Sequence, residues 1–241
     1  MPDRIQLIFD DWLSAEFGHH VLKLLINHPG EAKDEEIRQA LGETLMQDHV
    51  FIYSKIPVDA LACANILQKY GFRLVDTNII FEKQIANKDQ PSNLNAIRFA
   101  RPKDKDEVGR IALHNFVFSR FHLDPKIAME TANEIKAAWA KNFFSRKRGD
   151  VMVVSDGETR LSGFLQLVFD NKTLIVDLIA VDREKRRENI ANNMINFAQK
   201  KIDGFEFIRL GTQVANFSSM RLCENSGFRI RDAFYVFHYH N

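Results

Sequence analysis

Two segments of this chain repeat one another, and the repeat limits the folds that the chain can adopt. Residues 71–81, GFRLVDTNIIF, and residues 227–237, GFRIRDAFYVF, share Gly, Phe, Arg, Asp and a final Phe at matching positions. Each segment closes a run whose pattern predicts strand, helix, strand, helix, strand. Such a repeat favours two related α/β halves. Convergent use of Gly-Phe after a helix is the alternative explanation.

The boundary between the halves is predicted near residue 90. Residues 86–95 are polar and contain Pro91 and Ser92, which is typical of a linker. Residues 1–90 would then form a reduced N-terminal half, and residues 91–241 a complete C-terminal domain. The alternation of strands and helices in both parts predicts the α/β fold class.

Residues 174–191, LIVDLIAVDREKRRENIA, carry the clearest chemical signal. Residues 174–181 are apolar apart from Asp177, which predicts a buried strand, and helical spacing begins at Ile190. A strand that runs through a basic turn into a helix predicts an anion site, and phosphate is the usual ligand. A solvated turn is the alternative, but basic residues there oppose the helix dipole. The matching turn at residues 27–31 has no arginine, so the first half is predicted to lack the site.

Composition excludes several classes of function. The 241 residues are 45% hydrophobic and 27% charged, as in ordinary globular proteins. A formal net charge of +1 favours neither nucleic acid nor anionic lipid as a partner. We expect no membrane segment, because no apolar run approaches roughly 20 residues, and no signal peptide. The two cysteines, Cys63 and Cys223, suggest reduced thiols in a cytoplasmic protein.

Residues 186–191, RRENIA, together with the strand before them and the helix after them, resemble the coenzyme A loop of the GCN5-related N-acetyltransferases (GNAT). The family loop reads Arg/Gln-x-x-Gly-x-Gly/Ala, and Asn189 replaces its first glycine. Asparagine is the residue that best tolerates a positive φ after glycine, so the turn can survive. Residues 95–241 follow the family's order of elements. The resemblance implies a mixed sheet flanked by helices, with a truncated copy in the N-terminal half.

The same resemblance implies an enzyme, an N-acetyltransferase that uses acetyl-CoA as co-substrate and no metal. It implies direct transfer, in which the acceptor amine attacks the thioester and backbone N–H groups stabilise the oxyanion. The residues expected to bind the coenzyme are Ile179, Ala180, Val181, Arg186, Arg187, Glu188, Asn189, Ile190, Ala191 and Asn216.

Three residues are candidates for proton transfer. Asp177 is the only charge in its strand and is a candidate general base, although a carboxylate satisfied by neighbouring N–H groups is the alternative. The family has a tyrosine that protonates the departing thiolate where this chain has Cys223. Asn216 and Cys223 are nearly two helical turns apart, so we expect them on one face. A thiol can donate a proton, but a buried cysteine is more often a small apolar residue. Water or Tyr235 is the other candidate acid.

The acceptor site is expected where the family's first two helices lie, at His114, Ser119, Arg120 and His122. The closer likeness is to TDP-fucosamine acetyltransferases, in residues 211–216, GTQVAN, and 235–240, YVFHYH. It implies that the acceptor is the amino group of a nucleotide-linked amino deoxysugar. Another amine substrate and a non-catalytic binding module are the alternatives. A homodimer through C-terminal strands is also expected. His238 and His240 share a strand face, but no third ligand has a convincing spacing, so no metal site is predicted.

Overall fold

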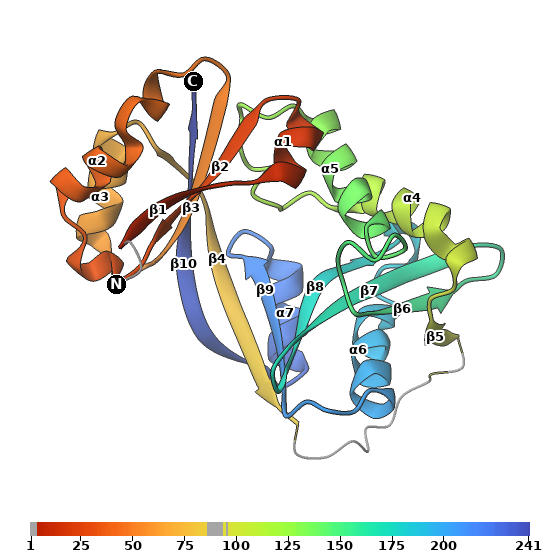
Figure 1. Cartoon of the computed structure of the whole chain (residues 1–241). Coiled ribbons are helices and arrows are strands. Elements are labelled where there is room, and N and C mark those ends of the chain that lie inside the picture. The colour runs from red at the N-terminus through yellow and green to blue at the C-terminus, as the bar shows by residue number, and fades with distance from the viewer. Residues whose placement is uncertain (1–3, 86–93, 95) are drawn as a thin grey trace.

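The described residues, 4–85, 94 and 96–241 of a computed structural model, form a ten-stranded mixed sheet with helices on both faces (Figure 1). The predicted α/β fold class is therefore confirmed. The proposed linker and the boundary near residue 90 lie, apart from Leu94, outside the described residues. The strands are β1 (Ile5–Phe9), β2 (His20–Ile26), β3 (Val50–Pro57), β4 (Arg73–Gln84), β5 (Ile97–Phe99), β6 (Val151–Asp156), β7 (Leu161–Asp170), β8 (Thr173–Val181), β9 (Phe207–Gln213) and β10 (Arg229–His240).

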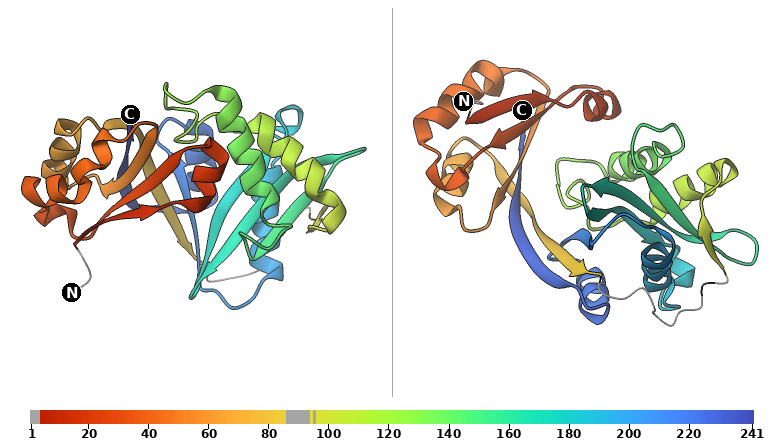
Figure 2. Two further views of the ribbon diagram at one scale, coloured as in Figure 1. Left: turned by 45° about the horizontal axis from the view of Figure 1, so that its top comes forward. Right: turned by 60° about the horizontal axis from the view of Figure 1, so that its bottom comes forward.

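The helices divide between the two faces of the sheet (Figures 1 and 2). α2, α3, α6 and α7 pack on one face, over the cores of the N-terminal and C-terminal strands. α1, α4 and α5 cover the other face, where α1 and α5 share a core that joins the two halves. The helices are α1 (Asp11–Phe17), α2 (Asp34–Leu41), α3 (Leu61–Lys69), α4 (Lys105–Asn115), α5 (Met129–Lys141), α6 (Ile190–Lys201) and α7 (Phe217–Asn225).

The two halves exchange their last strands. β10 lies between β3 and β4, and β4 lies between β10 and β9. In the order β2-β3-β10-β4-β9-β8, β2 corresponds to β8, β3 to β9 and β4 to β10. Exchanging the two members of each pair and reading the result backwards gives the same order. The parallel pairs β2–β3 and β8–β9 correspond in the same way. The sequence repeat is thus an approximate two-fold symmetry about the contact between β4 and β10.

Glycine begins each repeated segment because the chain must turn sharply there from helix to strand. Gly71 follows α3 with a φ of 86°, and Gly227 follows α7 with a φ of 76°. Both values lie in the left-handed region, where a Cβ atom is unfavourable. Each glycine therefore directly follows the C-cap residue of its helix, Tyr70 or Ser226, and lets the chain leave the helix in the left-handed conformation.

Candidate active site

A cavity of about 790 Å³ opens where β8 and β9 separate. Residues 173–176 of β8 pair with residues 207–210 of β9, and the pairing ends there. Opposite β7, the register jumps at Asp177, which forms a β-bulge. Because a bulge bends its strand, β8 turns away from β9 at this point. The β9-facing backbone of residues 177–181 is consequently left unpaired by the sheet, and it lines the cavity.

The predicted coenzyme loop lies at the far end of this cavity. Asn189 adopts a φ of 59°, the left-handed conformation expected where the family has its first glycine. Arg187 also has a positive φ, of 71°, which the sequence did not predict. Glu188 is the one predicted coenzyme residue that does not line the cavity, and it pairs with Lys185 at 3.7 Å. The nine that line it are Ile179, Ala180, Val181, Arg186, Arg187, Asn189, Ile190, Ala191 and Asn216.

The start of α6 suits an anion, whereas the start of its counterpart α2 does not. No side chain caps α6, and its first turn contains no acidic residue. Its first N–H groups and the positive end of its dipole therefore remain available to a phosphate. The first turn of α2 carries Asp34, Glu35 and Glu36, whose negative charges repel an anion. This contrast agrees with the prediction that the first half lacks the site.

Asp177 lines the cavity, but its carboxylate is already engaged. It accepts hydrogen bonds from Trp139 Nε1 at 2.9 Å, Gln166 Nε2 at 2.9 Å and Arg148 Nε at 2.8 Å. A second Arg148 nitrogen donates to its other oxygen. A carboxylate that already accepts this many hydrogen bonds is poorly placed to take a proton from an amine. This arrangement favours the satisfied carboxylate over the general base.

Neither candidate acid faces the cavity. Cys223 is fully buried in the core under α6 and α7, and burial raises the pKa of its thiol to about 12. Asn216 lines the cavity as the non-helical N-cap of α7, so helical spacing does not place Cys223 beside it. Tyr235 packs against the core of the N-terminal half, with β4 between its own strand and β9. The exchange of β4 and β10 is the reason for this displacement.

Of the four predicted acceptor residues, Ser119 alone lines the cavity. His114 is exposed at the end of α4. The Arg120 guanidinium carbon lies 3.9 Å from the centre of the Tyr53 ring, and burial lowers the pKa of this guanidinium. His122 stands behind Ser119, with its Nδ1 2.6 Å from the hydroxyl oxygen. The structure thus brings together Ser119 and His122 and separates them from His114.

Lys136 is a cavity residue that the sequence analysis missed. It is 8% exposed, and its ammonium lies 4.5 Å from the ring centre of Trp139 and 5.2 Å from that of Phe116. Burial, followed by the charge of Arg120, lowers the pKa of Lys136 to about 7, against the opposing charge of Asp177. Lys136 lies four residues from both Ala132 and Ala140, and residues at this spacing share a helix face. This spacing could have indicated that Lys136 faces the core.

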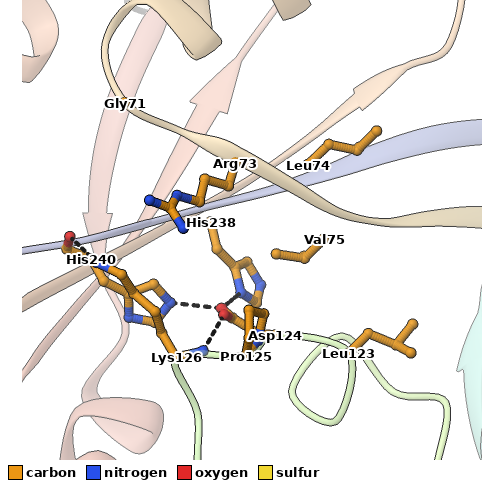
Figure 3. Close-up of a pocket in the computed structure, with 10 residues that line it drawn as sticks. All are labelled: Gly71, Arg73, Leu74, Val75, Leu123, Asp124, Pro125, Lys126, His238 and His240. Carbon is orange, nitrogen blue, oxygen red and sulfur yellow. Dashed lines mark hydrogen bonds and ion pairs between the residues drawn. The ribbon is translucent and has the colours of Figure 1, made fainter.

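A second cavity, of about 270 Å³, lies beside Asp124, His238 and His240, and Figure 3 shows these side chains converging. Asp124 supplies the third potential ligand beside the two histidines, and the sequence did not indicate that it lies there. His238 Nδ1 and His240 Nε2 lie 2.6 Å and 2.7 Å from one Asp124 oxygen. The three donor atoms lie within 4.8 Å of one another, as in a metal site.

Hydrogen bonding accounts for this cluster. Arg120 Nη1 faces His238 Nε2 at 3.4 Å, and a guanidinium can only donate, so the ring proton sits on Nδ1 and points at Asp124. A metal-binding nitrogen carries no proton, and the arginine adds an opposing positive charge. Burial alone would raise the pKa of Asp124, but hydrogen bonds from the two histidines hold it well below its usual range. The cluster fastens the loop between α4 and α5, which carries both Ser119 and Asp124, to β10.

Comparison with known proteins connects these features to acetyl transfer. Residues 113–228, which contain the cavity, match the Acetyltransferase (GNAT) family. The spore coat polysaccharide biosynthesis protein SpsD of Bacillus subtilis (strain 168) is 24% identical over 241 residues, covering 96% of this chain and 82% of SpsD. The matched family segment includes the strand, turn and helix that surround the predicted anion site.

Solved structures share the fold of the whole chain. A conserved protein of unknown function from Staphylococcus epidermidis ATCC 12228 superposes with a TM-score of 0.62 at 12% identity, covering 100% of this chain and 93% of that one. A tandem GNAT protein from the clavulanic acid biosynthesis pathway gives 0.60 at 12% identity, covering 91% and 75%. The tandem likeness agrees with two related halves. Among the described residues, no helix combines the length and apolar character needed to cross a membrane.

Proposed function

We propose that acetyl-CoA is the co-substrate of this chain, an N-acetyltransferase whose residues 113–228 match the Acetyltransferase (GNAT) family. The observation that carries the proposal is the cavity between β8 and β9, which ends at the uncapped start of α6. The pyrophosphate would bind Arg186 and the backbone of residues 187–191. The pantetheine amides would pair with the free backbone edge of residues 179–181, as an added strand pairs with a sheet edge.

We propose that the acceptor is the amino group of a nucleotide-linked amino deoxysugar, as in TDP-fucosamine acetyltransferases. Support comes from the likeness to SpsD, whose name places that protein in polysaccharide biosynthesis. The cavity volume of about 790 Å³ is also within the range of sites for sizeable ligands. Two free cysteines, Cys63 and Cys223, support a cytoplasmic location. A homodimer remains a prediction, but β10 cannot join it by edge pairing, because β3 and β4 occupy both of its edges.

The acceptor is tested by turnover. Purified protein, acetyl-CoA and dTDP- or UDP-linked 4-amino-4,6-dideoxysugars are expected to release free coenzyme A thiol, with the acetylated sugar detected by mass spectrometry. The matched control is the same nucleotide sugar with a 4-hydroxyl group, which offers no amine. Turnover with other amines but none of these sugars would refute the sugar assignment. Coenzyme binding without turnover of any amine would identify a binding module instead.

Arg186→Ala is expected to weaken acetyl-CoA binding about tenfold to a hundredfold, the equivalent of about 1.4 to 2.8 kcal/mol. The reason is the loss of a guanidinium at the cavity rim, where Arg186 Nη2 donates to the carbonyl oxygen of Asn115 at 3.2 Å. Isothermal titration calorimetry measures the change. Arg183→Ala is the matched control, because Arg183 is an exposed arginine of the same turn outside the cavity lining. Equal losses in both variants would point to general electrostatic attraction.

A further inference from the structure

We propose that Ser119, His122 and Asn133 form a proton relay that deprotonates the acceptor amine. The inference rests on the proposed acetyl transfer and assigns its general base. An amine is an ammonium ion near neutral pH and must lose a proton before it can attack a thioester. The engaged Asp177 leaves this task to another group, and Ser119 lines the same cavity.

The order of hydrogen bonds gives the relay a direction. His122 Nε2 lies 3.0 Å from Asn133 Oδ1, and an amide oxygen only accepts, so Nε2 carries the ring proton. His122 Nδ1 is then an acceptor, and the Ser119 hydroxyl 2.6 Å away donates to it. A hydroxyl, an imidazole and a group that orients the imidazole are the parts of an activated hydroxyl site.

The surroundings keep His122 neutral and the loop fixed. Burial lowers the pKa of His122, Asn133 opposes this shift, and the charge of Lys136 lowers the pKa further. Arg120 is the adjacent charged residue of the loop. Ser119 is 7% exposed, and its carbonyl oxygen accepts from the backbone of Leu123. The Asp124 cluster then ties the same loop to β10, so little reorganisation is needed when a proton moves.

One proton of the acceptor ammonium passes to Ser119 Oγ while the hydroxyl proton passes to His122 Nδ1, which leaves an imidazolium and a free amine. The amine attacks the thioester carbonyl, the carbon–nitrogen bond forms, and the carbon–sulfur bond breaks. The second nitrogen proton goes with the departing thiolate, and His122 later releases its proton to water. Ser119 and His122 are catalytic in this scheme, and Asn133 is a positioning residue.

Asn133→Asp tests the relay without removing it. A carboxylate stabilises the imidazolium, so the pKa of His122 is expected to rise by about one unit or more. Nuclear magnetic resonance of ¹⁵N-labelled histidine measures this pKa and shows which nitrogen carries the proton. The acid limb of kcat/KM for a dTDP-linked 4-amino sugar is expected to move upward with it. A proton on Nδ1, or an acid limb that stays in place, would overturn the relay.

Ser119→Ala and His122→Gln are expected to lower kcat about a hundredfold or more, with calorimetric acetyl-CoA affinity within about twofold of wild type as evidence of an intact fold. His20→Gln, which replaces an exposed histidine of β2, is the control. Turnover by Ser119→Ala within threefold of wild type overturns the relay alone. No turnover by the wild type with any amine overturns the proposed function as well. Acetyl-Ser119 formed from acetyl-CoA alone would make Ser119 a nucleophile and overturn the relay.

Discussion

Lys136→Met is expected to raise the free energy of unfolding by about 4 kcal/mol at pH 7. In the folded protein, burial lowers the pKa of Lys136 to about 7 from an ordinary value of 10.5. Between these values the unfolded chain binds the proton that the folded chain releases, so this lysine destabilises the fold more as pH falls. Methionine fills a similar volume among Phe116, Phe121 and Trp139 and carries no charge.

Urea unfolding of both proteins between pH 7 and 10.5 measures the effect. The wild type should gain stability relative to the variant by about 1.4 kcal/mol per pH unit, until the two converge near pH 10.5. Lys55, whose pKa is lowered to about 8 by burial, contributes a similar slope to both proteins and cancels in the difference. A difference that does not change with pH would show that Lys136 titrates normally in the folded protein.

Asp177→Ala is expected to lower the free energy of unfolding by about 2 to 3 kcal/mol. The substitution leaves the N–H groups of Trp139 and Gln166 without their acceptor and removes the partner of Arg148. The expected loss of stability is smaller than that for a fully buried ion pair, because the Arg148 side chain is 45% exposed and can reach water. Chemical denaturation of the variant measures the loss.

Asp177→Asn separates a structural role of Asp177, which holds Trp139, Gln166 and Arg148 through hydrogen bonds, from a role as general base. Its amide oxygen can still accept from Trp139 and Gln166, so the stability loss should be smaller than that of the alanine variant. We expect kcat to stay within about tenfold of wild type if Asp177 holds β8 in place. A much larger loss of kcat at unchanged stability would restore Asp177 as the base.

The backbone conformation of the proposed coenzyme loop could be predicted because it depends on local chemistry. The left-handed conformation at Asn189 follows from what asparagine tolerates, and the basic turn before α6 follows from consecutive residues. The repeat likewise predicted two related halves, because matching glycines at residues 71 and 227 meet the same backbone requirement. In these segments, nearest neighbours in sequence determine the structure.

The surroundings of the candidate proton-transfer residues were harder to predict because they depend on contacts between distant segments. Nothing in the pattern of β4 indicates that it lies between β9 and β10, and this placement takes Tyr235 away from the cavity. The partners of Asp177 come from α5, β7 and the loop before β6, and no spacing in its own strand indicates them. From the sequence alone, Lys136 resembles an ordinary surface lysine, because the sequence does not show that Phe116, Phe121 and Trp139 surround it.

The exchange of β4 and β10 also affects the order in which the protein can assemble. During synthesis, residues 4–85 emerge first, but β3 and β4 cannot complete their pairing until β10, near the end of the described chain, is available. Until then the edges of β3 and β4 that pair with β10 stay open. Open strand edges can pair with other chains. Contacts between residues so far apart in sequence also slow folding. The central seam of the sheet can therefore form only after β10 has been synthesised, and the N-terminal half depends on it as much as the catalytic half does.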